Sequence, residues 1–285
     1  MKCPALLHVA IAILWLAVPG TAQSFATGPT FDVASVKATP HSVTSNYHSF
    51  KDLGGPGTDS PTRWICTACG LLLLIQKAWE VDFFQIAAWE RLTGVDYDIT
   101  ANVPPGASPA DFLLMIQRLL AERIDLEVHM ERQEQAVMEL VIAKGGIKMT
   151  PAETIPEGGP PPSAVFEVDS RGIPQLPPGF PRPIHTLTAM GHVYAGRSRT
   201  IAELARQLET PISQLIVDHT GLTGKYDYFF HCSRDEVDNE TYGALAIGEC
   251  LKLILPEQLG LQLKPVKAMV DMLKVDRFNK QPSEN

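Results

Sequence analysis

Cys66 and Cys69 form the motif in this sequence that is best suited to chemistry. Two cysteines at this spacing can exchange a disulfide with a substrate when the N-terminus of a helix lowers the pKa of one thiol. The apolar segment 71–79 begins directly after them and predicts such a helix. A redox fold of this kind also needs a buried parallel strand before the motif, and the sequence indicates none. We therefore favour a static disulfide, with thiol–disulfide exchange as the alternative.

The first 22 residues have the features of a secretory signal peptide. Lys2 provides a positive start, and residues 9–18 form an apolar run that is too short for a comfortable membrane span. Small residues at Gly20 and Ala22 fit a cleavage site after Ala22. We expect a periplasmic or extracellular protein with no membrane span after cleavage. The alternative is an uncleaved membrane anchor.

Removal of this segment would leave four cysteines, and an even number in an exported protein favours disulfides. The candidates are Cys66, Cys69, Cys232 and Cys250. The pairing is open, since Cys66 and Cys69 can bond with each other or with another cysteine. A bond between Cys232 and Cys250 would close a loop that the chain-entropy model values at about 3 kcal/mol. A four-cysteine zinc site would need a second close pair, and we expect no metal and no cofactor.

The other titratable residues form no catalytic pattern. Asp218 and His219 are adjacent, but neighbouring residues of a strand point to opposite faces and cannot easily share a reaction. The chain has 24 Lys and Arg against 32 Asp and Glu, for a net charge of -8. Binding to phosphates needs a basic surface, so we expect no nucleic-acid partner.

A short sequence that occurs twice organises the chain. Each copy is a Thr-Gly turn that leads into a strand marked by Tyr-Asp, and its aspartates are assigned a role in forming the turn. The first copy contains Leu92, Thr93, Gly94, Tyr97 and Asp98, and the second contains Leu222, Thr223, Gly224, Tyr226 and Asp227.

In the first half, a helix after the first copy is indicated by Ser108 as N-cap, Pro109 in the first turn and Asp111 three residues after the cap. Alternation at 126–130 predicts a strand with one face in water, and we expect the segment 137–143 to pair with it. A polar loop is expected up to about residue 62. The predicted strands span 31–37, 83–88, 97–103, 126–130 and 137–143.

In the second half, Thr200 and Glu203 form a capping box that begins a helix. A further helix is predicted at 244–259, where Pro256 must kink or break it. The predicted strands span 214–217, 225–231, 261–264 and 270–276.

The two halves keep one order of elements, β-α-β-β-α-β-β. We therefore predict an α+β fold of two tandem modules, each with two helices packed between small sheets. The Pro- and Gly-rich composition between them predicts a linker that is semi-rigid where the prolines cluster. The expected parts are a signal peptide at 1–22, modules at 23–148 and 191–285, and a linker at 149–190.

A resemblance to a known family rests on the segments 31–37, 97–101, 119–123, 141–146, 217–227 and 282–285. They resemble the "soil-associated" exported proteins, which are built on a domain of unknown function, and the match covers nearly the whole mature chain. Two residues depart from the family pattern. His219 stands where the family usually has Arg, and Pro256 interrupts a helix that is usually unbroken.

The resemblance implies no established activity. The domain also occurs attached to membrane metallopeptidases of the antirepressor-sensor type, which implies sensing or binding in the envelope. This chain has no His-Glu-x-x-His stretch. The module order also resembles the short N-terminal domain of secretins and TonB-dependent receptors, which binds protein partners through strand edges and exposed faces.

We therefore expect an exported module that binds an envelope protein or a small ligand. The expected surface is a strand edge, or the groove between the modules beside the Pro-rich linker. A thiol–disulfide oxidoreductase that uses Cys66 and Cys69 is the competing class, and a purely structural envelope component is a third possibility.

Overall fold

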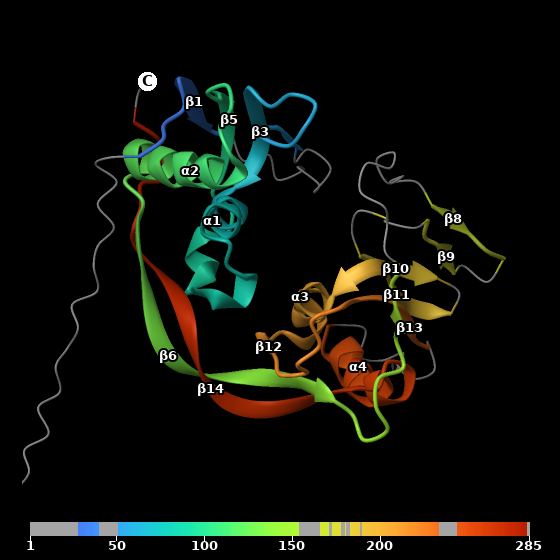
Figure 1. Ribbon diagram of the computed structural model, residues 1–285. Helices are drawn as coiled ribbons and strands as arrows, with labels where there is room; N and C mark the ends of the chain where they lie inside the picture. The colour runs from blue at the N-terminus through green and yellow to red at the C-terminus, as the bar shows by residue number, and fades with distance from the viewer. Residues whose placement is uncertain are drawn as a thin grey trace, which may run out of the picture.

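The computed structural model describes residues 28–39, 51–153, 166–170, 173–177, 180, 183–188, 190–233 and 244–283. This part of the chain is a mixed α+β protein with four α-helices and several small sheets. Figure 1 shows two lobes, each a sheet with helices, connected by a long two-stranded ribbon. Among the residues described, no helix is long and apolar enough to cross a membrane. The predicted signal peptide lies outside the described residues.

The first lobe is a four-stranded sheet in the order β1-β5-β3-β2, in which neighbouring strands are antiparallel. Side chains of α1 and α2 pack against one face of this sheet and form a core around residues such as Trp64, Tyr97 and Ile116. Its elements are β1 (Val33–Ala38), β2 (Lys51–Gly54), β3 (Arg63–Gly70), α1 (Leu71–Trp79), η2 (Phe83–Gln85), β4 (Ile86–Ala87), η3 (Trp89–Leu92), β5 (Asp96–Asn102) and α2 (Pro109–Ile124).

The second lobe repeats this arrangement with a sheet in the order β10-β11-β13-β7. Helices α3 and α4 cover one face, where Tyr228 and Phe230 of β13 share a buried core with Leu204 and Leu251. Its elements are β7 (Thr150–Pro151), β10 (Ile184–Thr188), β11 (Gly191–Thr200), α3 (Ile201–Ile212), β12 (Ile216–Asp218), β13 (Lys225–Cys232) and α4 (Ala244–Gln258). A separate hairpin pairs β8 (Glu167–Val168) with β9 (Pro174–Gln175).

The ribbon consists of β6 (Glu127–Ile142) and β14 (Leu261–Arg277), which pair antiparallel along their length. Each strand starts in its own half of the chain and ends in the lobe of the other half (Figure 1). Met138 and Leu140 of β6 belong to the core of the second lobe, and Leu273 of β14 belongs to the core of the first. Short strands extend the ribbon in parallel, β12 beside β6 and β4 beside β14. The two halves therefore exchange their last strands.

The predicted pairing of 126–130 with 137–143 is wrong, because both segments belong to the single strand β6. The segments 261–264 and 270–276 are likewise one strand, β14. The residues 131–136 contain no Gly, Pro, Asn or Asp, so nothing in them favours a turn. Strand β14 tolerates Pro265, which has no N–H to donate, because no donor is needed at this position. The opposite residue, Met138, directs its own N–H away from β14, so the two residues form a pair without backbone hydrogen bonds.

The other local predictions are confirmed at some elements and wrong at others. The helix at 71–79 is confirmed, and so are both capping boxes, in which Ser108 and Thr200 accept from Asp111 and Glu203. The strand predicted at 83–88 is wrong in part, since a 3₁₀ turn precedes the two residues of β4. The loop predicted up to residue 62 contains β2. Helix α4 continues through Pro256 into its last turn instead of breaking.

Replacement of Leu273 by Ala should destabilise the first lobe, although Leu273 lies close to the C-terminus. Its side chain is fully buried, so the free energy of unfolding should fall by about 2–5 kcal/mol. Trp64, Trp79 and Trp89 lie in the first lobe, so their fluorescence during urea unfolding reports on it. Met269→Ala, on the exposed face of the same strand, should change it by less than about 1 kcal/mol. An unchanged tryptophan transition in the Leu273→Ala protein would contradict the exchange of strands.

Candidate functional site

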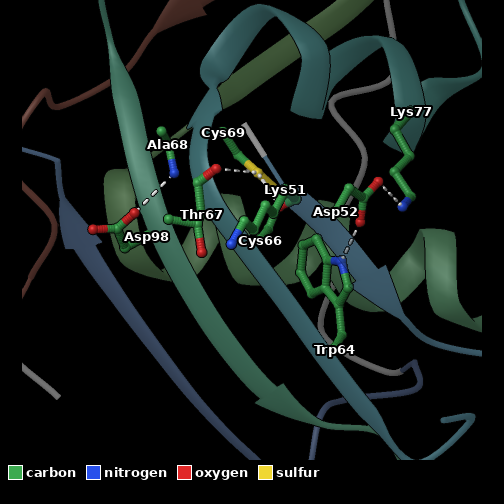
Figure 2. Close-up of a disulfide and its surroundings, with 9 residues drawn as sticks. All are labelled: Lys51, Asp52, Trp64, Cys66, Thr67, Ala68, Cys69, Lys77 and Asp98. Carbon is green, nitrogen blue, oxygen red and sulfur yellow. Dashed lines mark hydrogen bonds and ion pairs between the residues drawn. A yellow bond between two sulfur atoms is a disulfide. The ribbon is translucent and has the colours of Figure 1, made fainter. Parts of the chain in front are cut away.

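The disulfide between Cys66 and Cys69 lies within strand β3, directly before α1 (Figure 2). The two Cα atoms are 5.8 Å apart, and the residues are only 2% and 0% exposed. Edge strand β2 pairs with β3 here, and the Lys51 carbonyl oxygen lies 3.7 Å from the Cys69 sulfur. A substrate thiol would have to displace this packing before it could reach either sulfur.

A β-bulge separates the two cysteines, because the register of β3 on β5 shifts between them. Ala68 in this bulge has a left-handed φ of 50°, which is uncommon for a residue with a side chain. Its N–H donates to the Asp98 carboxylate at 2.8 Å (Figure 2). Two interactions thus stabilise the same bulge, namely the disulfide between Cys66 and Cys69 and the hydrogen bond from Ala68 to Asp98.

The second lobe has the same bulge without a disulfide. The register of β11 on β13 shifts between Gly196 and Arg199, and Ser198 has a φ of 55°. The Ser198 N–H donates to the Asp227 carboxylate at 2.7 Å. The aspartates of the two Tyr-Asp sequences therefore lie in strands β5 and β13 and accept from a bulge. No local sequence pattern predicts this contact, because donor and acceptor are about 30 residues apart.

The Thr-Gly turns of the repeat adopt different conformations. In the first copy, Gly94 has a φ of 71° and the Thr93 hydroxyl donates to the Glu90 carbonyl at 2.7 Å. In the second copy the left-handed residue is Gly221, with a φ of 70°, and Gly224 is not left-handed. Leu92 of the first copy is buried. In the second copy, Leu222 is half-buried and Thr223 is exposed.

The tyrosines of the repeat are both buried, and Tyr97 fixes the end of the chain. Its hydroxyl lies 3.2 and 3.3 Å from the carbonyl oxygens of Asn279 and Lys280, which share its one proton. The Ser283 N–H donates to the Arg123 carbonyl at 2.7 Å, so the C-terminal segment lies against the first lobe. Burial raises the pKa of Tyr97 to about 12, and the hydroxyl therefore keeps its proton at neutral pH.

A cation lies near the first disulfide but is already paired. Lys77 contacts the Asp52 carboxylate at 2.6 Å, and the same carboxylate accepts from the Trp64 indole at 2.7 Å (Figure 2). The Lys77 nitrogen also lies over the rings of Trp64 and Phe112, 5.6 and 5.4 Å from their centres. The charge of Lys77 is thus balanced at Asp52, which reduces its ability to stabilise a Cys66 or Cys69 thiolate.

The second disulfide joins Cys232 at the end of β13 to Cys250 on α4. The Cα atoms are 6.0 Å apart, the sequence separation is 18 residues, and both residues are buried. A loop of this length gives about 3 kcal/mol in the chain-entropy model. The bond ties the sheet of the second lobe to its covering helix.

The remaining sequence candidates are not assembled into a catalytic group. His219 pairs with Glu139 of β6 and not with its neighbour Asp218, whose carboxylate accepts from the Thr220 N–H at 2.9 Å. No group of three or more His, Cys, Asp or Glu that could hold a metal ion occurs among the described residues.

The two lobes also meet at a junction beside the ribbon. The Arg206 guanidinium on α3 pairs with the Asp82 carboxylate, and the Gln85 amide donates to the Asp271 carbonyl at 3.1 Å. Glu209, one turn from Arg206, is only 3% exposed and accepts from the Ile216 N–H at 3.1 Å. Burial raises the pKa of Glu209 to about 7, against the lowering effect of the Ile216 N–H. Asp82 raises this pKa further, and Arg206 lowers it.

The fold and the two cysteine pairs define a disulfide-stabilised α+β protein. Residues 72–278 match a family described as Protein of unknown function (DUF3738), and the chain belongs to this family. The predicted domain of unknown function is therefore confirmed. No curated protein and no solved structure matches the chain.

The bulge contact predicts that Asp98→Ala is more harmful than the loss of an ordinary surface carboxylate. The substitution leaves the Ala68 N–H without its charged acceptor, which should cost about 1–3 kcal/mol of unfolding free energy. Asp98→Asn keeps an oxygen acceptor, so its loss of unfolding free energy should be less than half of the loss caused by Asp98→Ala. Asp276→Ala, which removes an exposed partner of His129, serves as control and should cost below about 1 kcal/mol. Equal losses from both alanine substitutions in urea unfolding would contradict this role for Asp98.

Glu209 should make the stability of the protein depend on pH. The folded state holds the proton of Glu209 more tightly than the unfolded state, because the pKa is raised from 4.5 to about 7. The contribution of Glu209 to the free energy of unfolding is therefore complete below pH 4.5 and is lost as the pH rises through about 7. The loss is at most about 3 kcal/mol. Urea unfolding of Glu209→Gln between pH 5 and 8 should show a smaller decline than the wild type. Glu249→Gln, at an exposed carboxylate, should decline as the wild type does, and an equal decline in Glu209→Gln would refute the assignment.

Proposed function

We propose that the protein is an exported binding module that captures an extended segment of an envelope protein along the open edge of strand β6. The two buried disulfides support an oxidising compartment, which agrees with a signal peptide at 1–22. The observation that carries the proposal is the long stretch of β6 that has a neighbouring strand on one side only.

Strand β12 covers only a small part of the outer edge of β6. It pairs with Met138, Glu139 and Leu140, and between Glu127 and Val137 no other described strand lies on this side. Strand β4 covers a still shorter part of β14, at Leu273 and Lys274. Such an edge has backbone donors and acceptors that a further strand can use.

The contacts of β12 establish which residues of β6 point to the open side. The Met138 N–H donates to the Leu215 carbonyl and the Leu140 carbonyl accepts from the His219 N–H, both at 2.9 Å. Backbone groups alternate along a strand. The row that begins with Met138 and Leu140 therefore continues toward the N-terminus through Ala136, Glu134 and Arg132.

An incoming segment would extend the row that β12 begins. Acidic side chains in the open part of β6 are already paired across the ribbon, Glu134 with Lys267 at 3.3 Å and Glu127 with Arg277 at 2.8 Å. The edge thus offers mainly backbone groups, and main-chain hydrogen bonds would supply affinity while alternate side chains supply specificity. Recognition by a strand edge agrees with the resemblance to the short N-terminal domain of secretins and TonB-dependent receptors.

We also infer that the two lobes are copies of one module, with bounds near 23–148 and 191–285 and a linker at 149–190. The order β3-α1-β4-β5-α2-β6 recurs as β11-α3-β12-β13-α4-β14. The bulge with its aspartate acceptor recurs at Asp98 and Asp227. Repeated order and a repeated unusual contact together support duplication.

The oxidoreductase alternative has no comparable support. Both sulfur-bearing residues of the Cys66–Cys69 pair are buried, and Lys77 is engaged by Asp52. Redox-active cysteines sit in partly exposed, electropositive surroundings. A stapling role suits the observed packing better.

Ala136→Pro tests the edge, because it removes an outward N–H without taking a hydrogen bond from the ribbon. We expect the variant to fold and to lose about tenfold or more of its capture of envelope proteins. Ala136→Val keeps the N–H and should capture as the wild type does. Gln135→Pro removes a hydrogen bond to β14 and should destabilise the fold by about 3 kcal/mol.

The readout is quantitative mass spectrometry of envelope proteins retained by each immobilised variant, with circular dichroism to establish folding. Hydrogen exchange of the free protein should be faster at the amides of Arg132, Glu134 and Ala136 than at the amides between them. A folded Ala136→Pro protein that retains the wild-type set of partners would exclude binding by this edge.

A further inference from the structure

The sheet of the second lobe is covered on the face that α3 and α4 leave free. Tyr194 of β11 belongs to the core under these helices, so its neighbours Val193 and Ala195 point to the opposite face. They are only 0% and 4% exposed, which requires a cover on this face as well. Strand β9, whose Pro174 is buried, lies on this side near Ala195 (Figure 1). Part of the segment expected to be a linker thus packs on this sheet.

A cavity of about 330 Å³ lies between β9 and this face of the sheet. This volume is at the lower end of the range of about 300–1,000 Å³ that is usual for ligand pockets, so it suits a small molecule. The walls combine apolar side chains with one ion pair. The apolar walls come from Ile173, Leu176, Ala195 and Phe229, and the charged groups belong to Arg197 and Asp227.

The bulge of β11 places Arg197 at this cavity. Arg197 is one of its extra residues and lies opposite Asp227, and the corresponding residue in the first lobe is Thr67, opposite Asp98. An aspartate holds the bulge in both lobes, so the bulge itself does not require an arginine at this position. A cation that only the second lobe has here indicates a role other than forming the bulge.

The Arg197 guanidinium is only partly engaged. Its Nη1 lies 3.3 Å from Asp227 Oδ2, and the described residues provide it with no second ion pair. A guanidinium has several further N–H donors, which remain available to a ligand. The other oxygen of Asp227 accepts from the Ser198 N–H at 2.7 Å, which fixes the carboxylate in place. The two side chains are 38% and 23% exposed, so a solute can reach both charges.

We propose that this cavity binds a free α-amino acid with an apolar side chain. Such an amino acid is a zwitterion, whose carboxylate and ammonium are attached to one carbon atom. The carboxylate accepts from the unused N–H groups of Arg197, and the ammonium donates to Asp227. Each charge of the ion pair therefore meets its opposite. The side chain of the ligand packs against Phe229 and the other apolar walls.

The ion pair also discriminates against molecules that carry only one of the two charges. A carboxylate without an ammonium is repelled by Asp227, and an ammonium without a carboxylate is repelled by Arg197. This cavity is separate from the strand edge of β6, so failure of either proposal leaves the other intact.

The first test is saturation-transfer NMR of L-leucine with the full chain at pH 7. N-acetyl-leucine lacks the ammonium and leucinamide lacks the carboxylate. Each should bind about tenfold or more weakly than L-leucine, because each loses a charge-assisted hydrogen bond. This comparison uses only the wild-type protein and does not depend on the folding of variants. Equal affinity for the three compounds, or no transfer to L-leucine, would overturn the proposal.

The second test is Arg197→Thr, which introduces the residue that the first lobe has at the corresponding position. The bulge should therefore form, with an unchanged circular dichroism spectrum, while the affinity for L-leucine should fall about tenfold or more. Arg91→Gln, at an exposed arginine of the first lobe, should leave this affinity unchanged, and so should Ala136→Pro.

Wild-type affinity in a folded Arg197→Thr protein, or an equal loss in Arg91→Gln, would exclude this site. If Arg197→Thr does not fold, the comparison of the three compounds decides.

Discussion

The exchange of the last strands is the constraint on which the rest of the structure depends. Strand β6 leaves the first lobe and completes the core of the second with Met138 and Leu140, and β14 returns to bury Leu273 in the first. Neither half would hide these apolar side chains by itself, and burial is the main force that stabilises a fold. The strands pair over a separation of more than a hundred residues, from Leu261 with Ile142 to Arg277 with Glu127. The ribbon therefore couples the two lobes in folding and in stability.

The elements that the sequence predicted well are those with local signals. Ser108 with Asp111 and Thr200 with Glu203 set helix starts through contacts three residues apart, which a sequence displays directly. The partner of a strand has no such signal, because alternation reveals a half-buried strand and not its neighbour. Two segments of β6 were therefore expected to pair with each other. The absence of turn-forming residues between them was the available sign of a continuous strand.

The site shows the same division. The four cysteines were evident from their number, and the structure joins the near pair and the far pair, one of the arrangements left open. The aspartate contacts to the bulges were missed because they bridge distant positions.

The bulges separate what the two lobes share from what distinguishes them. An aspartate holds the bulge in both, so the disulfide in the first lobe is not required to form it. That disulfide closes a very short loop and restrains the unfolded chain less than the bond between Cys232 and Cys250 does. The exchanged strands have a further consequence. A half that folded its last strand back on itself would have no long ribbon, whereas exchange produces one whose edges are only partly covered by β4 and β12. The feature that couples the lobes thus also creates the edge that a partner could use.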